Sequence, residues 1–242
     1  MKRIEKTNEL LWILGTVLVA LGVSICGKAD LGVSMIAAPA FVVSEALISS
    51  LGSFFSVGVT EYILQGILLI TLCILIRKFN WRYLLSFAVA IIYGYTLNLF
   101  LWLWGDVQIT AIPLRWLMLL IGDCVTAIGV ACFFRTSIPL TVYELFVSEF
   151  SKSFKSTISK TKWCFDMALL IISILLAILL FGDITSFDWS TIYSSSFHSI
   201  GLGTIVTTAI NSPLINFMGK LLDKIFIPTP MFKKTNELLK IK

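Results

Sequence analysis

Six apolar runs set the main constraint on this chain, because each is close to the length at which an α-helix crosses a lipid bilayer, about 20 residues. Only 14% of the 242 residues are charged and 57% are hydrophobic, whereas soluble proteins carry roughly 25% charged residues. The sequence therefore predicts an all-α, polytopic membrane protein, with residues 1–242 forming a single membrane domain. The expected transmembrane helices are Leu10–Cys26, Val57–Ile76, Tyr83–Trp104, Leu114–Phe134, Trp163–Phe181 and Gly201–Met218.

Two further apolar segments are predicted not to cross the membrane: each enters it and turns back, or, in the case of the first, lies at the interface. Val33–Leu51 contains Pro39 and Glu45, and Ile138–Phe150 is too short to span. Irregular backbone at membrane depth survives only where protein covers it or where it lines a wet cavity. These re-entrant segments therefore indicate where a polar pathway would lie.

Basic residues decide this topology, since Lys and Arg accumulate in cytoplasmic loops. Basic groups occur before the first run (Lys2, Arg3, Lys6) and after the run that ends at Ile76 (Arg77, Lys78, Arg82). If Val33–Leu51 crossed the bilayer fully, the second group would face outward. We therefore expect six spans with both termini in the cytoplasm. In this arrangement 17 of the 19 Lys and Arg residues are cytoplasmic, and the exceptions are Lys28 and Arg115.

The two halves of the chain resemble each other. Lys28 returns as Arg135 and Ser34 as Thr141, both 107 residues further on. The same offset relates Leu21-Gly22-Val23 to Ile128-Gly129-Val130. Glu61 in the second span matches Asp166 in the fifth, and Asn98 near the end of the third span matches Asn216 near the end of the sixth. The predicted repeats are residues 9–105 and 113–220, followed by a basic cytoplasmic tail, 221–242. Because each half has an odd number of spans, the repeats are expected to be inverted, as in many secondary transporters.

Charged residues within the apolar runs are the candidate functional groups, because each costs at least ~2.5 kcal/mol at the centre of a membrane helix. Asp123, near the middle of its run, is interpreted as a proton-binding or cation-coordinating carboxylate, or as a buried acid with a partner. Glu61 and Asp166 are alternatively helix-start carboxylates facing the helix dipole. Lys28 and Arg135 are interpreted as anion contacts or gate salt bridges, or as side chains that snorkel to the interface. The predicted pathway comprises Lys28, Asp30, Glu61, Gln65, Asn98, Asp123, Arg135, Glu144, Asp166 and Asn216.

No enzymatic or metal site is predicted. The five cysteines have no CxxC spacing, and there is one histidine, His198. Gly201-Leu202-Gly203 lacks the strand–helix context of a phosphate loop, so we interpret it as a broken helix start. No cofactor and no nucleic acid are expected, because the basic residues flank apolar runs and face the bilayer. The predicted function is a transporter for a small polar or ionic solute; the alternatives are an accessory or scaffold protein and the substrate-binding membrane component of a multi-subunit importer. A second copy or another membrane subunit is an alternative partner.

Several motifs resemble the YczE/YyaS/YitT group of bacterial integral membrane proteins. They are Lys28-Ala29-Asp30-Leu31-Gly32-Val33-Ser34, Phe165-Asp166, Gly201-Leu202-Gly203-Thr204-Ile205 and Ser212-Pro213-Leu214-Ile215. The chain has Ser212-Pro213 where members of the group usually have Gly-Pro, and Val142-Tyr143-Glu144 where many have Pro-aromatic-Asp. The resemblance implies a bacterial inner-membrane protein and says little about the substrate.

Overall fold

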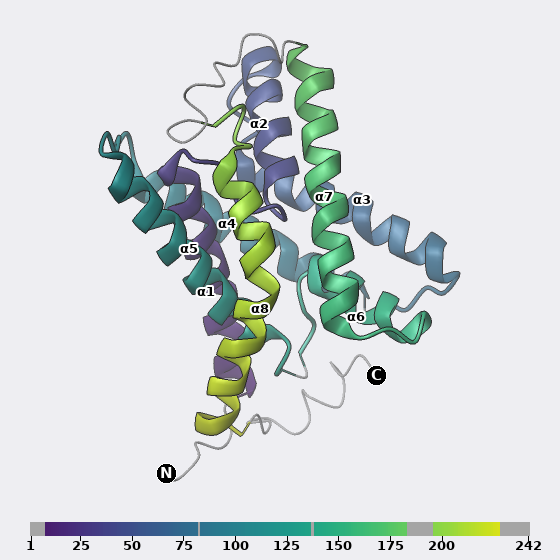
Figure 1. The fold of residues 1–242 in the computed structure, drawn as a ribbon. Helices are drawn as coiled ribbons and strands as arrows, with labels where there is room; N and C mark the ends of the chain where they lie inside the picture. Colours follow the sequence, from purple (N-terminus) through teal and green to yellow (C-terminus); the bar gives the residue numbers. More distant parts are fainter. Residues whose placement is uncertain (1–7, 82, 137, 183–195, 228–242) are drawn as a thin grey trace.

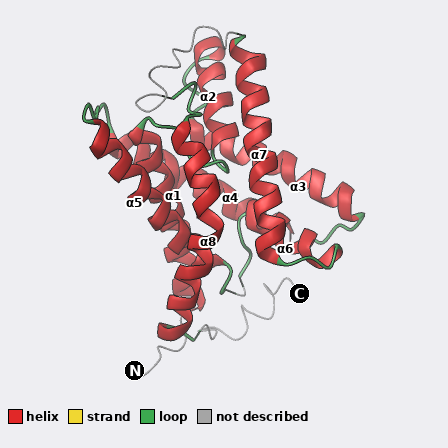
Figure 2. Cartoon of the chain, viewed as in Figure 1, coloured by secondary structure: helices red, strands yellow, loops and turns green. Residues whose placement is uncertain are grey.

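The computed structural model describes residues 8–81, 83–136, 138–182 and 196–227, and these residues form eight α-helices joined by short loops (Figures 1 and 2). The predicted all-α class is confirmed for this part of the chain. Arg82, the acidic stretch with Asp183 and Asp188, and the basic residues at both termini lie outside the described residues. The helices are α1 (Asn8–Ala29), α2 (Ala38–Leu51), α3 (Val57–Ile76), α4 (Tyr83–Trp104), α5 (Ile112–Phe133), α6 (Val142–Ser153), α7 (Ile158–Phe181) and α8 (Leu202–Ile225).

Five of the helices, α1, α3, α4, α5 and α7, are long and apolar enough to cross a membrane. The chain is therefore a membrane protein. The sixth predicted span corresponds to α8, which is long enough but more polar. Its inward face carries Thr204, Thr207, Thr208, Asn211 and Ser212, all at most 7% exposed. These groups lower its mean hydropathy, so the sixth span stays a prediction.

Helix α3 illustrates how the sequence divides a membrane helix into two faces. Ile63, Ile67, Ile70 and Ile74 recur at helical spacing and are exposed, so they form the face available to lipid. The opposite face is buried and carries both small and polar residues, including Gly58, Glu61 and Gln65. The polar groups of α3 thus point toward the other helices.

The two segments predicted to be re-entrant form short helices. Helix α2 has 14 residues and begins beside Pro39, and α6 has 12 residues and begins after Thr141. The backbone turns sharply before α2, where Asp30 and Gly32 have φ values of 52° and 103°. Both helices are too short to span a bilayer. Figure 1 shows α2 beside the upper end of α7 and α6 beside its lower end.

The ends of several predicted spans shift by up to three residues, and two ends differ by five or more. Helix α7 begins at Ile158 rather than Trp163, because Thr157 caps it by accepting a hydrogen bond from the backbone N–H of Lys160. Lys162, expected in a cytoplasmic loop, therefore lies within the helix. Helix α8 continues to Ile225 rather than ending at Met218.

Helices α1 and α5 form an antiparallel pair, which is the most extensive helix–helix contact of the fold. A Cβ at Gly15 would lie 3.1 Å from the carbonyl oxygen of Gly129, and a Cβ at Gly22 would lie 2.6 Å from that of Gly122. Glycines at these positions let the two backbones approach as they do in tightly packed membrane helix pairs. One end of the α1–α5 pair carries Asp30, and the other carries Arg135. We call these the Asp30 end and the Arg135 end.

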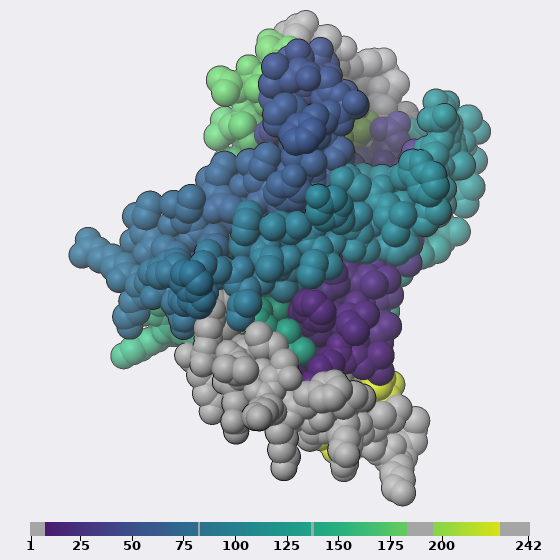
Figure 3. Space-filling model, turned by 180° about the vertical axis from the view of Figure 1, so that it is seen from behind, coloured from purple at the N-terminus to yellow at the C-terminus, as the bar shows by residue number. Residues whose placement is uncertain are grey.

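The remaining helices are arranged in similar ways in the two halves of the chain. In the first half α4 packs on α1 and α3, and in the second half α8 packs on α5 and α7. The short helix α2 packs on α3 and α7, and the short helix α6 packs on α7 and α3. Seen from behind, α3 and α4 form a band across the molecule with part of α1 below it (Figure 3). Each short helix therefore bridges the two halves of the chain.

Candidate functional site

Five charged side chains from four helices gather inside the protein. Glu61 on α3, Asp123 on α5, Glu144 on α6, and Lys162 and Asp166 on α7 are each at most 4% exposed. We call these five residues the buried charge cluster. Glu144 interacts electrostatically with Glu61, Lys162 and Asp166, and Asp123 interacts with Lys162 and Asp166. The cluster holds four carboxyl groups and a single ammonium group, so protonation or bound cations must balance the excess acid.

Within this cluster Lys162 is paired with Asp166. The Lys162 Nζ atom lies 3.1 Å from Asp166 Oδ1, one helical turn away. Neither carboxylate oxygen of Asp123 makes a hydrogen bond within the described residues, and the same is true of Asp166 Oδ2 and Glu61 Oε1. Buried polar atoms are normally hydrogen-bonded to protein, water or ions. These oxygens are therefore available as acceptors.

Glu61 and Gln65 hold the start of α6. The Tyr143 hydroxyl donates to Glu61 Oε2 at 2.8 Å, and the backbone N–H of Val142 donates to Gln65 Oε1 at 3.2 Å. The second bond satisfies one of the free N–H groups at a helix N-terminus. Two polar residues of the predicted pathway, one turn apart on α3, thus fix the short helix of the other half.

A small cavity lies between the breaks that precede α2 and α6. Its volume is about 20 Å³, and its polar lining is Ser34, Thr126, Thr141 and Glu144, with the tyrosines Tyr93 and Tyr143. Ser34 Oγ is buried and has no hydrogen-bond partner within the described residues. A cavity needs roughly 10–15 Å³ to hold one water molecule. This central cavity has room for one water or one small ion.

A larger pocket opens at the Arg135 end and has a volume of about 440 Å³. We call it the Arg135 pocket. Its buried lining includes Lys162, which also belongs to the buried charge cluster. One side chain therefore connects the open pocket with the polar centre of the protein. The lining residues are Phe134, Arg135, Ile158, Ser159, Lys162, Ser212, Ile215, Asn216 and Lys220.

Arg135 is fixed at the rim of this pocket. Its Nε and one terminal nitrogen bind the two carboxylate oxygens of Asp223 at 2.6 and 2.7 Å, and the other terminal nitrogen donates to the Ala131 carbonyl at 3.1 Å. Gly219 makes room for the guanidinium, since a Cβ there would lie 2.5 Å from one of its nitrogens. Bidentate pairing of this kind gives the guanidinium a defined orientation.

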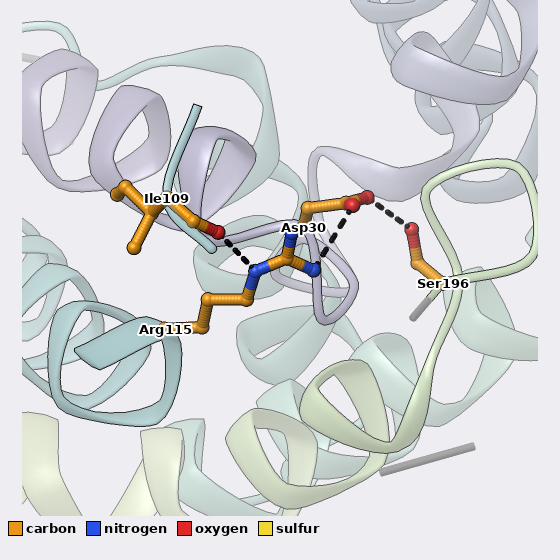
Figure 4. A network of polar contacts seen from close by, with 4 residues as sticks. All are labelled: Asp30, Ile109, Arg115 and Ser196. Atoms are coloured by element: carbon orange, nitrogen blue, oxygen red, sulfur yellow. Dashed lines mark hydrogen bonds and ion pairs between the residues drawn. The ribbon is translucent and has the colours of Figure 1, made fainter. Parts of the chain in front are cut away.

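The Asp30 end is held together by a polar network (Figure 4). Arg115 lies 3.3 Å from Asp30 Oδ2 and also donates to the Ile109 carbonyl, while the Ser196 hydroxyl donates to Asp30 Oδ1 at 2.9 Å. Nearby, His198 Nδ1 lies 2.8 Å from Glu45 Oε1. Lys28 donates to the Gly105 carbonyl. These contacts tie α1 and α2 to the start of α5 and to the segment before α8.

The glycine motif before α8 serves close backbone packing. The N–H of Gly203 donates to the Leu31 carbonyl at 2.9 Å, and a Cβ at Gly201 would lie 2.3 Å from that carbonyl oxygen. The N–H of Val33 donates to the Ser199 carbonyl at 2.9 Å. Two of the motifs singled out in the sequence therefore meet in space, at the turn between α1 and α2.

Asn98 and Asn216 make similar contacts. Asn98 accepts from the N–H of Gly58 at 2.9 Å and donates to Ser56 Oγ at the start of α3. Asn216 donates to Ser159 Oγ at 3.0 Å at the start of α7. Each asparagine thus anchors the third helix of its own half.

The predicted pathway residues separate into groups. Glu61, Gln65, Asp123, Glu144 and Asp166 come together in the centre, while Lys28 and Asp30 lie at one end and Arg135 at the other. Sequence reasoning missed Lys162, Lys220 and the role of Ser212. For Lys162, the available signal was its spacing from Asp166, which lies four residues further along the same helix. Among the described residues, no three His, Cys, Asp or Glu side chains are arranged to hold a metal ion.

Comparison with known proteins gives one match. No curated protein and no solved structure matches the chain. The resemblance to the YczE/YyaS/YitT group stays a prediction. A family model covers residues 6–220, most of the sequence, and the chain belongs to that family, DUF6198, a family of unknown function.

Proposed function

We propose that this protein transports a small polar or ionic solute along a path between the two halves of the chain. The observation that carries the proposal is the continuity of polar groups through Lys162. This side chain lines the open Arg135 pocket and interacts with Glu144, which lines the central cavity with Ser34. Buried charges in membrane helices are costly and commonly mark substrate or ion pathways.

An inverted repeat is the proposed framework for this path. The glycine contacts of α1 and α5 support it, because the 107-residue offset turns Gly15 into Gly122 and Gly22 into Gly129. The offset therefore exchanges the contact Gly15–Gly129 with the contact Gly22–Gly122, as a two-fold axis between antiparallel helices requires. The similar arrangement of the other helices and the similar contacts of Asn98 and Asn216 support the same relation.

The orientation proposed for the protein places the Arg135 end in the cytoplasm. Lys152, Lys155 and Lys160 flank α6 and α7 at this end, and Lys220 and Lys224 close α8. Retention of Lys and Arg on the cytoplasmic side supports this orientation. With α8 as the sixth span, both termini face the cytoplasm. The resemblance to the YczE/YyaS/YitT group suggests the inner membrane of a bacterium.

The proposed mechanism is alternating access between the two ends. In this structure the Arg135 pocket is open, whereas the equivalent region of the first half carries the Lys28–Gly105 contact and the Asp30–Arg115 network. Inverted repeats allow the halves to exchange these arrangements by rocking about a central site. The excess of carboxyl groups over Lys162 supports coupling to protons or small cations.

Uptake into vesicles tests this function. The full-length protein would be reconstituted and assayed against a panel of amino acids, carboxylates, phosphate and cations, with and without a proton or sodium gradient. Asp123→Asn should abolish gradient-driven uptake if this carboxyl group couples the ion. Asp106→Asn, in an exposed loop, is the matched control and should retain uptake. If no gradient drives uptake of any solute in the panel, the transport proposal is wrong.

An accessory or scaffold role is the second candidate. Glu61, Asp123 and Asp166 line neither the central cavity nor the Arg135 pocket, and Asp166 is paired with Lys162. Acids that line no pocket, together with an internal ion pair, would also suit a protein that supports a membrane complex. Co-purification of a stoichiometric membrane partner from the native host, together with negative uptake assays, would favour this role.

A further inference from the structure

The lining of the Arg135 pocket has a distinct charge. Arg135, Lys162 and Lys220 all line it, and no carboxyl group is among its lining residues in the described chain. Asp223 and Asp166, which pair with Arg135 and Lys162, lie outside the lining. The charged groups that line this pocket are thus all cations, and a concave surface with charges of one sign concentrates a field that attracts anions.

Hydrogen-bond donors remain available on these cations. The Arg135 guanidinium carries N–H groups beyond those that bind Asp223 and Ala131, and the Lys162 ammonium carries N–H groups beyond the one directed to Asp166. The contacts with these acids also hold both side chains in place. Prepositioned charged donors bind carboxylates and phosphates more strongly than mobile surface lysines do.

The deep part of the pocket supplies a further polar group. Ser212 lines the pocket, is 7% exposed, and its Oγ has no hydrogen-bond partner within the described residues. Ser159 and Asn216 add neutral polar groups, and apolar side chains, including Phe134 and Ile215, complete the wall. The volume, about 440 Å³, falls within the range of about 300–1,000 Å³ that small-molecule sites occupy.

We propose that the Arg135 pocket binds a small oxyanion, a carboxylate or a phosphate, through Arg135, Lys162, Lys220 and Ser212. Its identification as the transported solute rests on the proposed function, whereas the binding itself does not. Lys162 then meets the anion on one side and Asp166 on the other, so anion binding and the buried charge cluster act on the same ammonium group.

An oxyanion could come from a free solute or from a lipid headgroup, since both carry phosphate. The free solute is favoured because two of the binding groups, Lys162 and Ser212, are buried at the inner wall of the pocket, beyond the exposed rim at Lys220. A headgroup tethered to acyl chains would remain near the rim. Binding of a soluble anion and binding of a lipid can be measured separately.

The test uses the full-length protein in a detergent without net charge. The protein is titrated with potassium phosphate or potassium acetate, and a titration with potassium chloride at the same ionic strength is the reference. Isothermal titration calorimetry should detect saturable binding of phosphate or acetate at one site. Lys220→Gln should weaken it roughly tenfold, as expected for the loss of a charge-assisted hydrogen bond, and Ser212→Ala should weaken it by a smaller factor. Lys220→Arg should restore most of the affinity. Lys224→Gln, one turn further along α8 and outside the pocket, should leave the affinity unchanged.

The outcomes separate this inference from the transport proposal. Saturable binding without uptake in vesicles supports the anion site and contradicts transport. Gradient-driven uptake of a neutral or cationic solute, with no binding of phosphate or acetate, supports transport and overturns the anion site. Equal affinities in Lys220→Gln and Lys224→Gln would also overturn it. In nanodiscs, saturable binding of phosphatidylglycerol that Lys220→Gln weakens, with no soluble anion bound, would replace the free solute by a lipid headgroup.

Discussion

Gly22 on α1 lies directly against Gly122 on α5, with no room for a side chain on either residue. A Cβ at Gly122 would lie 2.7 Å from Cys26 Sγ and 2.8 Å from the Gly22 carbonyl oxygen. Gly122→Ala should therefore destabilise the protein by about 1–3 kcal/mol, the usual cost of overpacking a tight core. Thermal unfolding of the full chain in detergent measures the change.

Gly66→Ala is the control for this substitution. Gly66 is also helical, but its Cβ would lie 3.2 Å from the Phe87 ring, a side chain that can shift. Its unfolding temperature should stay within a few degrees of the wild-type value. A Gly122→Ala protein as stable as Gly66→Ala would show that α1 and α5 are not closely packed.

Because Lys162 and Asp166 form a buried ion pair, the free energy of unfolding should depend strongly on both residues. Lys162→Leu leaves the Asp166 carboxylate without its cation in a buried site, which should cost about 3–5 kcal/mol. The double variant Lys162→Leu/Asp166→Leu should recover part of this loss, because Asp166 no longer leaves a carboxylate without its paired cation. Chemical unfolding of the wild type, Lys162→Leu, Asp166→Leu and the double variant measures the coupling between the two positions.

Lys152→Leu provides the comparison with an exposed ion pair. Lys152 lies 2.8 Å from Glu149, but its side chain is 58% exposed, so the loss should be below about 1 kcal/mol. If Lys162→Leu and Lys152→Leu destabilise the protein equally, Lys162 does not occupy a buried position.

The Asp30 network should limit access to the protein from the outer side. In a chain that keeps Cys26 as its only cysteine, this buried thiol should react slowly with a membrane-impermeant reagent added outside. Arg115→Gln removes the ion pair with Asp30 and should speed the reaction roughly two- to fivefold, as expected for a pair worth up to about 1 kcal/mol. Lys78→Gln removes a basic residue from a different loop and should not change the rate. An unchanged reaction rate in Arg115→Gln would show that this network does not restrict access of the reagent to Cys26.

Cysteine labelling also tests the membrane topology. Ser50 at the end of α2 and Ser153 at the end of α6 are both exposed in the structure. In a cysteine-free background, Ser50→Cys should be labelled by an impermeant reagent from outside, and Ser153→Cys only after the membrane is opened. Labelling on the reverse sides would contradict the six-span arrangement with cytoplasmic termini.

The helix pattern could largely be predicted from the sequence, because apolar runs in a membrane protein end where polar or turn-forming residues begin. Helices α3 and α4 have the predicted bounds, Val57–Ile76 and Tyr83–Trp104. The predicted start of α7, Trp163, was wrong, because the first turns of this helix are polar and resemble a loop when hydropathy alone is considered. The cap at Thr157 extends that helix over Lys160 and Lys162.

The site was predictable where a charge interrupts an apolar run. Glu61, Asp123 and Asp166 stand out for this reason, and the structure brings them together with Glu144. Lys162 did not stand out, because it precedes the apolar run and belongs to a group of lysines that resembles a cytoplasmic loop. Its burial depends on packing between helices far apart in sequence, which no local pattern reports.

The attachment of Gly203 to the Leu31 carbonyl has a consequence for motion. This hydrogen bond joins the first turn of α8 to the turn between α1 and α2. These two segments, one from each half, therefore move together for as long as the bond is kept. The lower part of α8, which carries Asn216 and Lys220, lies beyond Pro213, a residue that interrupts the helical hydrogen bonds and permits bending. Closure of the Arg135 pocket would therefore bend α8 at Pro213, while the first turn of α8 stays hydrogen-bonded to Leu31.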